Sequence, residues 1–160
     1  LLYVRDGLKI SPLFFGGGQE KGLRSGTENV PGIVGFATAC ELSLKNDWAG
    51  VSKMRDYLIE KLQEAGGNII GALGRYRLPN NVFVSFPKVN AEELMHKLSV
   101  RGIYVSQGSA CDSKKEKENY ALRAIGLSAN EMKSSLRISL PANVSKQEVD
   151  YFVKVLTNLL

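Results

Sequence analysis

Two residues of this 160-residue chain combine reactive side chains with positions that suit chemistry, and the first is Cys111. It ends the run VSQGSAC, so it follows a predicted strand on a glycine-containing loop where a thiol is accessible. The thiolate is the nucleophilic form of cysteine. Nearby Lys114 and Lys115 favour its formation, whereas Asp112 opposes it. The same context also suits a surface cysteine without a catalytic role.

The second residue is Arg137, in the segment LRISL. Alternation predicts a strand with Leu136, Ile138 and Leu140 on one face and Arg137 on the other. An arginine there is either a solvated charge or a fixed guanidinium that binds a carboxylate through two parallel hydrogen bonds. A nucleophile on a loop and an anion-binding group on a neighbouring element together indicate a site.

A third segment, GGGQEKGLRSGTEN, is a fourteen-residue run of glycine and polar residues. Irregular stretches of this length are uncommon in compact proteins unless they line a site. Asn29, at its end, is a predicted N-cap for the next helix, and Pro31 lies near that helix's first turn.

The elements around these segments follow from apolar periodicity. Residues 1–15 contain the β-like runs LLYV and LKISPLFF. The helix after Asn29 has a predicted buried face of Ile33, Val34, Phe36, Ala37, Cys40 and Leu44. A second helix follows a bend or domain junction at residues 46–50 and ends at Gly66-Gly67. Its apolar face consists of Val51, Met54, Leu58 and Leu62.

Beyond Gly67, the segments NVFVSF, IYVS and LRISL predict three strands. A short helix follows Asn90 and ends by Gly102, and another spans residues 120–125. Three pairs have the spacing of capping boxes: Asn90 with Glu93, Ser128 with Glu131, and Ser145 with Glu148. The last helix has Val149, Phe152, Val153 and Leu156 inward. The pattern predicts an α+β fold with helices on one face of a small sheet.

Composition narrows the function classes. Hydrophobic residues make up 44% and charged residues 23%, as in ordinary globular proteins. The formal net charge is +5, but no basic stripe alternates with aromatics, which argues against nucleic-acid binding. Clustered lysines instead favour an acidic protein partner. No long apolar run predicts a membrane helix, no signal-peptide pattern opens the chain, and two cysteines fit a reducing, cytoplasmic location.

Three stretches carry a resemblance to a known family: GGGQEKGLRSGTENVPGIVG, VSQGSACDS and SSLRISL. They resemble, in the same order, signature stretches of group I (NifS/IscS-like) cysteine desulfurases. These are pyridoxal 5'-phosphate (PLP) enzymes of the class V aminotransferase family. The interval from Cys111 to Arg137 is also similar to that between the family's nucleophile and its substrate-carboxylate arginine. The resemblance covers the chain from Leu1 to Leu160.

The resemblance implies a role for each candidate. Cys111 would attack the sulfur of the substrate L-cysteine and become a persulfide, and L-alanine would be released. Arg137 would bind the carboxylate of that cysteine. Thr27 would hydrogen-bond the phosphate of the PLP in the partner subunit of a homodimer, with Arg24 as a further candidate at that interface. Asp112 departs from the small hydroxyl residue usual in the family. The sulfur would pass to an acceptor protein, such as an iron–sulfur scaffold, or would be used for thiolation.

The resemblance also implies a division of the chain and an incomplete site. Residues 1–46 would be the C-terminal end of the large PLP-binding domain. Residues 47–160 would be the small C-terminal domain of the aspartate aminotransferase-like fold, fold type I. The family's Schiff-base lysine precedes the region matched here, so this chain alone is expected neither to hold PLP covalently nor to turn over cysteine. His96, the only histidine, is expected to be structural, and no metal site is predicted.

Other functions remain open at this stage. A selenocysteine lyase or another class V enzyme shares the fold, although aminotransferases need no thiol in this loop. A non-catalytic module that docks a sulfur acceptor would also suit a chain without the cofactor lysine. The strand predicted at LLYV would lack its sheet neighbours in this chain, so self-association through that exposed apolar surface is expected.

Overall fold

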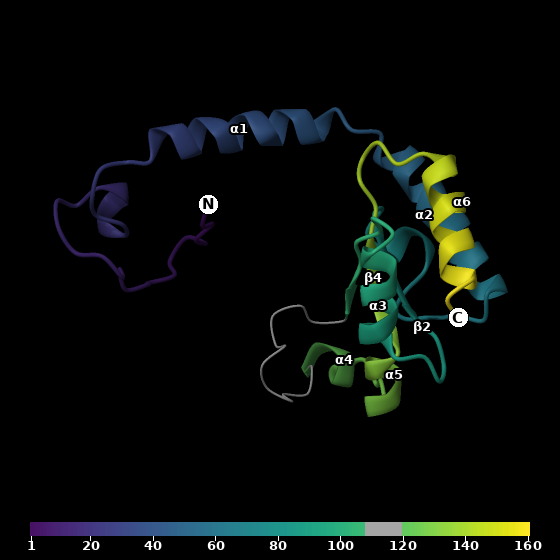
Figure 1. Ribbon diagram of the computed structural model, residues 1–160. Coiled ribbons are helices and arrows are strands. Elements are labelled where there is room, and N and C mark those ends of the chain that lie inside the picture. Colours follow the sequence, from purple (N-terminus) through teal and green to yellow (C-terminus); the bar gives the residue numbers. More distant parts are fainter. Residues whose placement is uncertain (108–119) are drawn as a thin grey trace. The chain divides into compact units, whose positions relative to one another are not determined.

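The computed structural model describes residues 1–107 and 120–160, and the chain divides into two compact units, Leu1–Asn46 and Asp47–Leu160 (Figure 1). The first contains η1 (Glu20–Gly22) and α1 (Val30–Leu44). In chain order, the second contains α2 (Trp48–Glu64), β1 (Asn68–Ile69), η2 (Gly74–Tyr76), β2 (Asn81–Ser85), α3 (Ala91–Ser99), β3 (Ser106–Gln107), α4 (Tyr120–Ala124), α5 (Ala129–Lys133), β4 (Ser135–Ser139) and α6 (Lys146–Thr157). The assignment of the two units to a large and a small domain stays a prediction.

Apart from the short helix η1, the first unit is irregular until α1 begins. The predicted cap is confirmed, because the Asn29 side chain accepts a hydrogen bond from Gly32 N at 3.2 Å and Pro31 lies in the first turn. The predicted β-like runs in residues 1–15 are wrong, since this segment forms no strand. A strand requires a hydrogen-bonded neighbour, and no described segment pairs with it.

The predicted buried face of α1 is also wrong. None of its residues is buried: Ile33 is 54% exposed, Phe36 51% and Leu44 86%. Cys40, expected inside a helix core, is exposed as well. The apolar side chains of α1 surround the helix instead of forming one stripe, and no described residue covers them. Access of a thiol reagent to Cys40 therefore requires no unfolding.

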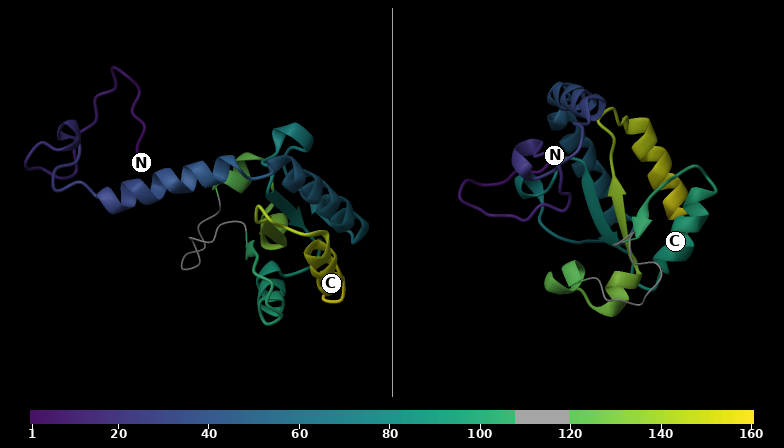
Figure 2. Two further views of the ribbon diagram at one scale, coloured as in Figure 1. Left: turned by 90° about the horizontal axis from the view of Figure 1, so that it is seen from above. Right: turned by 90° about the vertical axis from the view of Figure 1, so that its left-hand side faces the viewer.

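The second unit is built on a four-stranded antiparallel sheet of order β1-β2-β4-β3 (Figure 2). In its centre, Val82 pairs with Ile138 and Val84 with Leu136. Residues paired directly across an antiparallel ladder point to the same face, so these four side chains share one face. Each is at most 6% exposed, which confirms the predicted alternation of both strands.

The strand predicted at IYVS is shorter and lies further along the chain. Only Ser106 and Gln107 pair with β4. Ile103 cannot join them, because its N–H donates to Leu98 O at 3.1 Å in the turn that ends α3. The glycine in that turn, Gly102, has φ +74°. Ile103, where the strand was expected to start, therefore belongs to the turn that ends α3.

The core lies on the apolar face of the sheet. Buried side chains of α2, α3 and α6 join those of β2 and β4 in one cluster, which confirms the predicted inward faces of the three helices. A polar contact also links two of the helices, because the Tyr57 hydroxyl donates to Asp150 Oδ1 at 2.6 Å. The buried members of the three helices are Val51, Leu58, Ile59, Leu62, Ala91, Leu94, Leu98, Val149, Phe152 and Leu156.

The predicted helix ends are confirmed in detail. At the end of α2, Gly66 has φ +86°, and Gly67 N donates to Leu62 O at 2.8 Å, which is the Schellman pattern. Gly67 is needed for another reason: a Cβ there would lie 2.7 Å from Val84 Cγ2. Two of the three predicted capping boxes form, with Ser128 at α5 and Ser145 at α6. At α3, Asn90 accepts from Glu92 N and Glu93 N, but the Glu93 carboxylate pairs with Lys97.

Candidate functional site

Arg137 lies in the middle of β4, where it pairs with Phe83 of β2 on one side and with Ser106 of β3 on the other. Its strand neighbours Leu136 and Ile138 point into the core, so the arginine is on the opposite face, and it is partly exposed. Among the described residues, none forms a hydrogen bond or ion pair with its guanidinium group. The strand therefore fixes the backbone of Arg137, and the N–H donors of its guanidinium group are available to a ligand.

The register between β3 and β4 relates Arg137 to the cysteine loop. Ser106 is opposite Arg137, and Gln107 is opposite Leu136. Cys111 follows Gln107 by only four positions, but it lies outside the described residues, as do Asp112, Lys114 and Lys115. The structure thus describes the strand that leads to the loop and leaves the role of Cys111 a prediction.

Thr27 belongs to the irregular segment of the first unit, and its side chain is exposed. The segment is held by its own side chains. Gly26 N donates to Gln19 Oε1 at 3.0 Å, and Gly18 N donates to Ser25 Oγ at 3.4 Å. Gly18 and Gly26 have φ values of +80° and +101°, which glycine adopts easily. The backbone beside the Thr27 hydroxyl is therefore constrained, although the side chain faces solvent.

Arg24 contributes to that constraint. Its Nη1 donates to the backbone oxygens of Ser25 at 3.3 Å and of Thr27 at 3.2 Å. Its Cζ also lies 5.9 Å from the centroid of the Phe14 ring. The resemblance suggested Arg24 for a subunit interface, but within this chain the side chain supports the turn that carries Thr27. The three predicted site residues thus fall in different places: Thr27 in the first unit, Arg137 in the second, and Cys111 outside the described residues.

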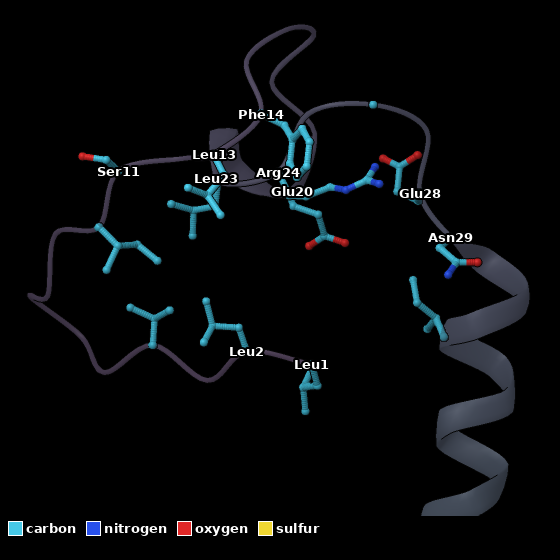
Figure 3. A pocket seen from close by; sticks show the side chains of 14 residues that line it. Leu1, Leu2, Ser11, Leu13, Phe14, Glu20, Leu23, Arg24, Glu28 and Asn29 are labelled. Atoms are coloured by element: carbon cyan, nitrogen blue, oxygen red, sulfur yellow. The ribbon is translucent and has the colours of Figure 1, made fainter. Parts of the chain in front are cut away.

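A pocket of about 640 Å³ lies within the first unit (Figure 3). Most of its lining is aliphatic or aromatic, and Leu1, Leu2, Leu13 and Leu23 lie around it. Figure 3 shows the Glu20 carboxylate pointing into the space between these leucines. The pocket includes Arg24 and Gly26 but not Thr27, so the residue expected at the phosphate does not line it.

Arg55 is a residue that the sequence patterns missed. It is only 3% exposed, and its Nη1 donates to the backbone oxygens of Arg77 at 3.1 Å and Leu78 at 3.0 Å. Asp56 pairs with it at 2.7 Å. A signal was present in the sequence, because Arg55 occupies a position of the same helical stripe as Val51, Leu58 and Leu62. A buried arginine needs such partners.

Among residues 1–107 and 120–160, no group of three or more His, Cys, Asp or Glu side chains is arranged to hold a metal ion. In the same residues, no helix has both the length and the apolar character required to cross a membrane.

Comparison with known proteins places this geometry in a family. Residues 1–152 match the family described as aminotransferase class-V. The chain belongs to the class-V aminotransferases. Its sheet, with an apolar face under α2, α3 and α6 and with Arg137 on the other face, is therefore a part of that family's α+β architecture, fold type I.

Curated relatives within this family carry names that agree with the predicted resemblance. The chain is 39% identical to cysteine desulfurase IscS 1 of Archaeoglobus fulgidus, over 99% of this chain and 42% of the relative. It is also 39% identical to cysteine desulfurase IscS of Methanosarcina thermophila, over 99% of this chain and 40% of the relative. The chain thus spans about two fifths of the length of these relatives.

Solved structures show the same likeness. A NifS-like protein matches with a TM-score of 0.84 and 40% identity, over 98% of this chain and 40% of that chain. A NifS-like protein from Rickettsia africae matches with a TM-score of 0.80 and 31% identity, over 95% and 40%. A protein described as SspA in complex with cysteine matches with a TM-score of 0.59 and 34% identity, over 88% and 39%.

Membership of the class-V aminotransferases implies PLP in the complete protein. Two side chains in the described part of the chain have hydrogen-bond donors that suit PLP and an amino-acid substrate. A hydroxyl on a glycine-rich turn, as at Thr27, suits a phosphate group, because glycine allows the backbone to approach its oxygens. An open guanidinium on a strand, as at Arg137, suits a carboxylate.

Proposed function

We propose that this chain is part of a PLP-dependent cysteine desulfurase, which converts L-cysteine to L-alanine and carries the sulfur as a persulfide on Cys111. The observation that supports this most directly is the pairing of Arg137 with Ser106. This pairing places the guanidinium-bearing residue beside β3, and the chain runs from β3 to Cys111 within the VSQGSAC segment. The names of the relatives and the complex of SspA with cysteine point to the same substrate.

Each residue has a separate task in the proposed reaction. The Arg137 guanidinium binds the substrate carboxylate and thereby orients the amino acid. The Cys111 thiolate attacks the substrate sulfur, so that an S–S bond forms as the C–S bond breaks. The electron pair of the broken bond stays on carbon, which takes up a proton to give alanine. PLP, when bound, supplies the electron sink that makes this carbon chemistry possible, and Thr27 holds its phosphate.

The assembly is part of the proposal. Thr27 acts across the interface of a homodimer, on the PLP of the partner subunit. The persulfide sulfur passes to an acceptor protein, for iron–sulfur cluster assembly or for thiolation. We place the enzyme in the cytoplasm, since two cysteines in 160 residues do not suggest a disulfide-stabilised exported protein. The 160-residue chain alone is expected to be inactive and to lack covalently bound PLP.

The experiment separates substrate binding from sulfur transfer in the complete parent polypeptide. Cys111→Ala should retain cysteine binding, measured calorimetrically, and release almost no alanine. Arg137→Ala should weaken cysteine binding by roughly 30- to 1000-fold, because a charge-assisted bidentate contact contributes about 2–4 kcal/mol. Arg137→Lys should recover only part of the affinity, since an ammonium group lacks the planar fork.

Matched controls are present in the chain. Cys40→Ser changes the other cysteine, which is exposed on α1. Arg101→Ala removes an exposed arginine whose side chain, within the described part of the chain, donates only to Lys97 O. Both should keep normal binding and alanine formation. Normal turnover by Cys111→Ala would place the nucleophile elsewhere, and normal cysteine affinity of Arg137→Ala would make that arginine a solvated charge. Exclusive turnover of L-selenocysteine would identify a selenocysteine lyase.

A further inference from the structure

The loop between β1 and β2, residues 70–80 and here called the η2 loop, is fixed by two arginines. Arg77 donates from Nε to Ala72 O at 2.6 Å, from Nη1 to Asn81 O at 3.4 Å and from Nη2 to Ile70 O. Arg55, from α2, donates to the carbonyl oxygens of Arg77 and Leu78. The guanidinium groups thus bind backbone acceptors near both ends of the loop and in its second half, which restricts its conformation.

The same loop exposes large apolar side chains. Leu73 is 53% exposed, Tyr76 74% and Leu78 69%. Arg75 stacks on Tyr76, with its Cζ 4.8 Å from the ring centroid, and its Nη2 donates to the Tyr76 hydroxyl at 2.6 Å. These exposed side chains add little to the core, and tyrosine and arginine are enriched among residues that contribute most to protein interfaces.

The loop borders a pocket of about 510 Å³ with an excess of positive charge. The charged side chains that line it are Arg55, Arg75, Arg77 and the single carboxylate Asp56. Trp48 adds an aromatic wall. Three arginines face one carboxylate, so the local charge is incompletely balanced. The pKa of Arg77 is lowered, first by burial and then by the positive charge of Arg55. A ligand carboxylate would reduce that imbalance.

We propose that the η2 loop and this pocket form a docking surface for a partner protein, which presents a segment with carboxylates next to an aliphatic or aromatic side chain. The carboxylates of the segment face Arg75 and the pocket, and its apolar side chain packs on Tyr76 and Leu78. Because Arg55 and Arg77 already hold the loop backbone, binding costs little ordering entropy. Thr27, Arg137 and Cys111 are not among the residues that form this surface, so the proposal does not rest on the desulfurase activity.

The test uses fluorescein-labelled peptides and the 160-residue chain. The probe is Glu-Asp-Leu-Phe-Asp-Glu-Leu, compared with a peptide in which lysine replaces every acidic residue and one in which glycine replaces Leu and Phe. Anisotropy titrations should show saturable binding of the first peptide, at least tenfold stronger than that of either comparison peptide, and weaker in high salt. Arg75→Glu and the double change Tyr76→Ser with Leu78→Ser should each weaken it about tenfold or more.

The controls use exposed residues of the same kinds elsewhere in the second unit. Arg101→Glu and Tyr151→Ser, the latter in a side chain that is 53% exposed on α6, should leave peptide affinity unchanged. All four changes are at exposed positions, and circular dichroism should confirm that each variant is folded. Absence of saturable binding, equal binding of all three peptides, or equal weakening by the control changes would overturn the proposal. Binding by the 160-residue chain but not by the complete parent would also overturn it, because the rest of the parent would then cover the loop.

Discussion

At the residue scale, Arg55 shows how a buried charge becomes part of a fold. Its donors reach two backbone carbonyls of the η2 loop and the carboxylate of Asp56, and 3% of the residue is exposed. A charge in this position is tolerated because each of the three guanidinium nitrogens has an acceptor. The contact connects α2 to a loop more than 20 positions away in the sequence, just before β2 begins.

Removal of this guanidinium should destabilise the second unit. Arg55→Met keeps the length and apolar stem of the side chain but leaves the carbonyl oxygens of Arg77 and Leu78 without a donor. We expect a loss of about 2–4 kcal/mol in the free energy of unfolding, measured by urea denaturation. Arg101→Met, at an exposed arginine, should change it by less than about 0.5 kcal/mol. Equal stability of the two variants would show that water replaces Arg55 at no cost.

At the element scale, two short-range motifs determine where α5 and α6 begin. In α5, Ser128 N and Ser128 Oγ both donate to Glu131 Oε2, at 2.8 and 2.6 Å. In α6, Ser145 N and Ser145 Oγ donate to Glu148 Oε2 at 2.8 and 2.7 Å. Both pairs form between residues three positions apart, so each helix start depends on local chemistry.

These bonds predict a pH dependence. Hydrogen bonds from the Ser128 side chain, and then from its backbone, lower the pKa of Glu131 below its ordinary value of 4.5. The Ser145 backbone, and then its side chain, do the same to the pKa of Glu148. Since the folded-state pKa is lower than the unfolded one, each carboxylate stabilises the fold fully above pH 4.5. That stabilisation is lost as the pH falls through the folded-state value.

The double variant Glu131→Gln with Glu148→Gln should therefore be less stable than the wild type at pH 7 and equal to it in strong acid. Urea unfolding at a series of pH values measures this difference. In a background with Ser128→Ala and Ser145→Ala, the same glutamine changes should produce a smaller pH-dependent difference, because the hydroxyl donors are lost while the backbone N–H donors to both carboxylates remain. A difference that is the same at every pH would rule out the carboxylate charge as its cause.

At the scale of the whole molecule, the two units differ in what they bury. Among the described residues, every buried apolar residue lies in the second unit, from Val51 to Leu156, whereas α1 contains none. The second unit thus has its own core between the sheet and three helices. The first unit leaves apolar side chains such as Ile33 and Phe36 about half exposed to water. These side chains therefore contribute less hydrophobic stabilisation than buried ones do.

Core and α1 substitutions should consequently have unequal effects. Leu62→Ala, at a fully buried position, should cost about 2–5 kcal/mol in the free energy of unfolding of the second unit. Phe36→Ala, on α1, should change it by less than about 0.5 kcal/mol. The fluorescence of Trp48, the only tryptophan and a residue packed against the core, reports this transition. Similar losses for both variants would mean that α1 contributes to the stability of the second unit.

The sequence by itself determined the features that depend on neighbours a few positions apart. Asn29, Ser128 and Ser145 cap helices because a side-chain oxygen reaches an N–H three residues later. The alternation in β2 and β4 identified which side chains of each strand are buried, and the periodicity of α2, α3 and α6 did the same for the helices. The sequence motifs also indicated the family. They supplied the predicted site residues, of which Thr27 and Arg137 lie within the described part of the chain.

Only the tertiary structure decided features that depend on distant partners. The pairing of Arg137 with Ser106, the short β3, the burial of Arg55 and the exposure of Cys40 all follow from which segments are neighbours in space. Periodicity identifies an apolar helix, as it did for α1, but burial requires a second surface to cover it, and no described residue does so. A strand similarly requires a ladder partner, which residues 1–15 lack among the described residues because local propensity cannot supply one.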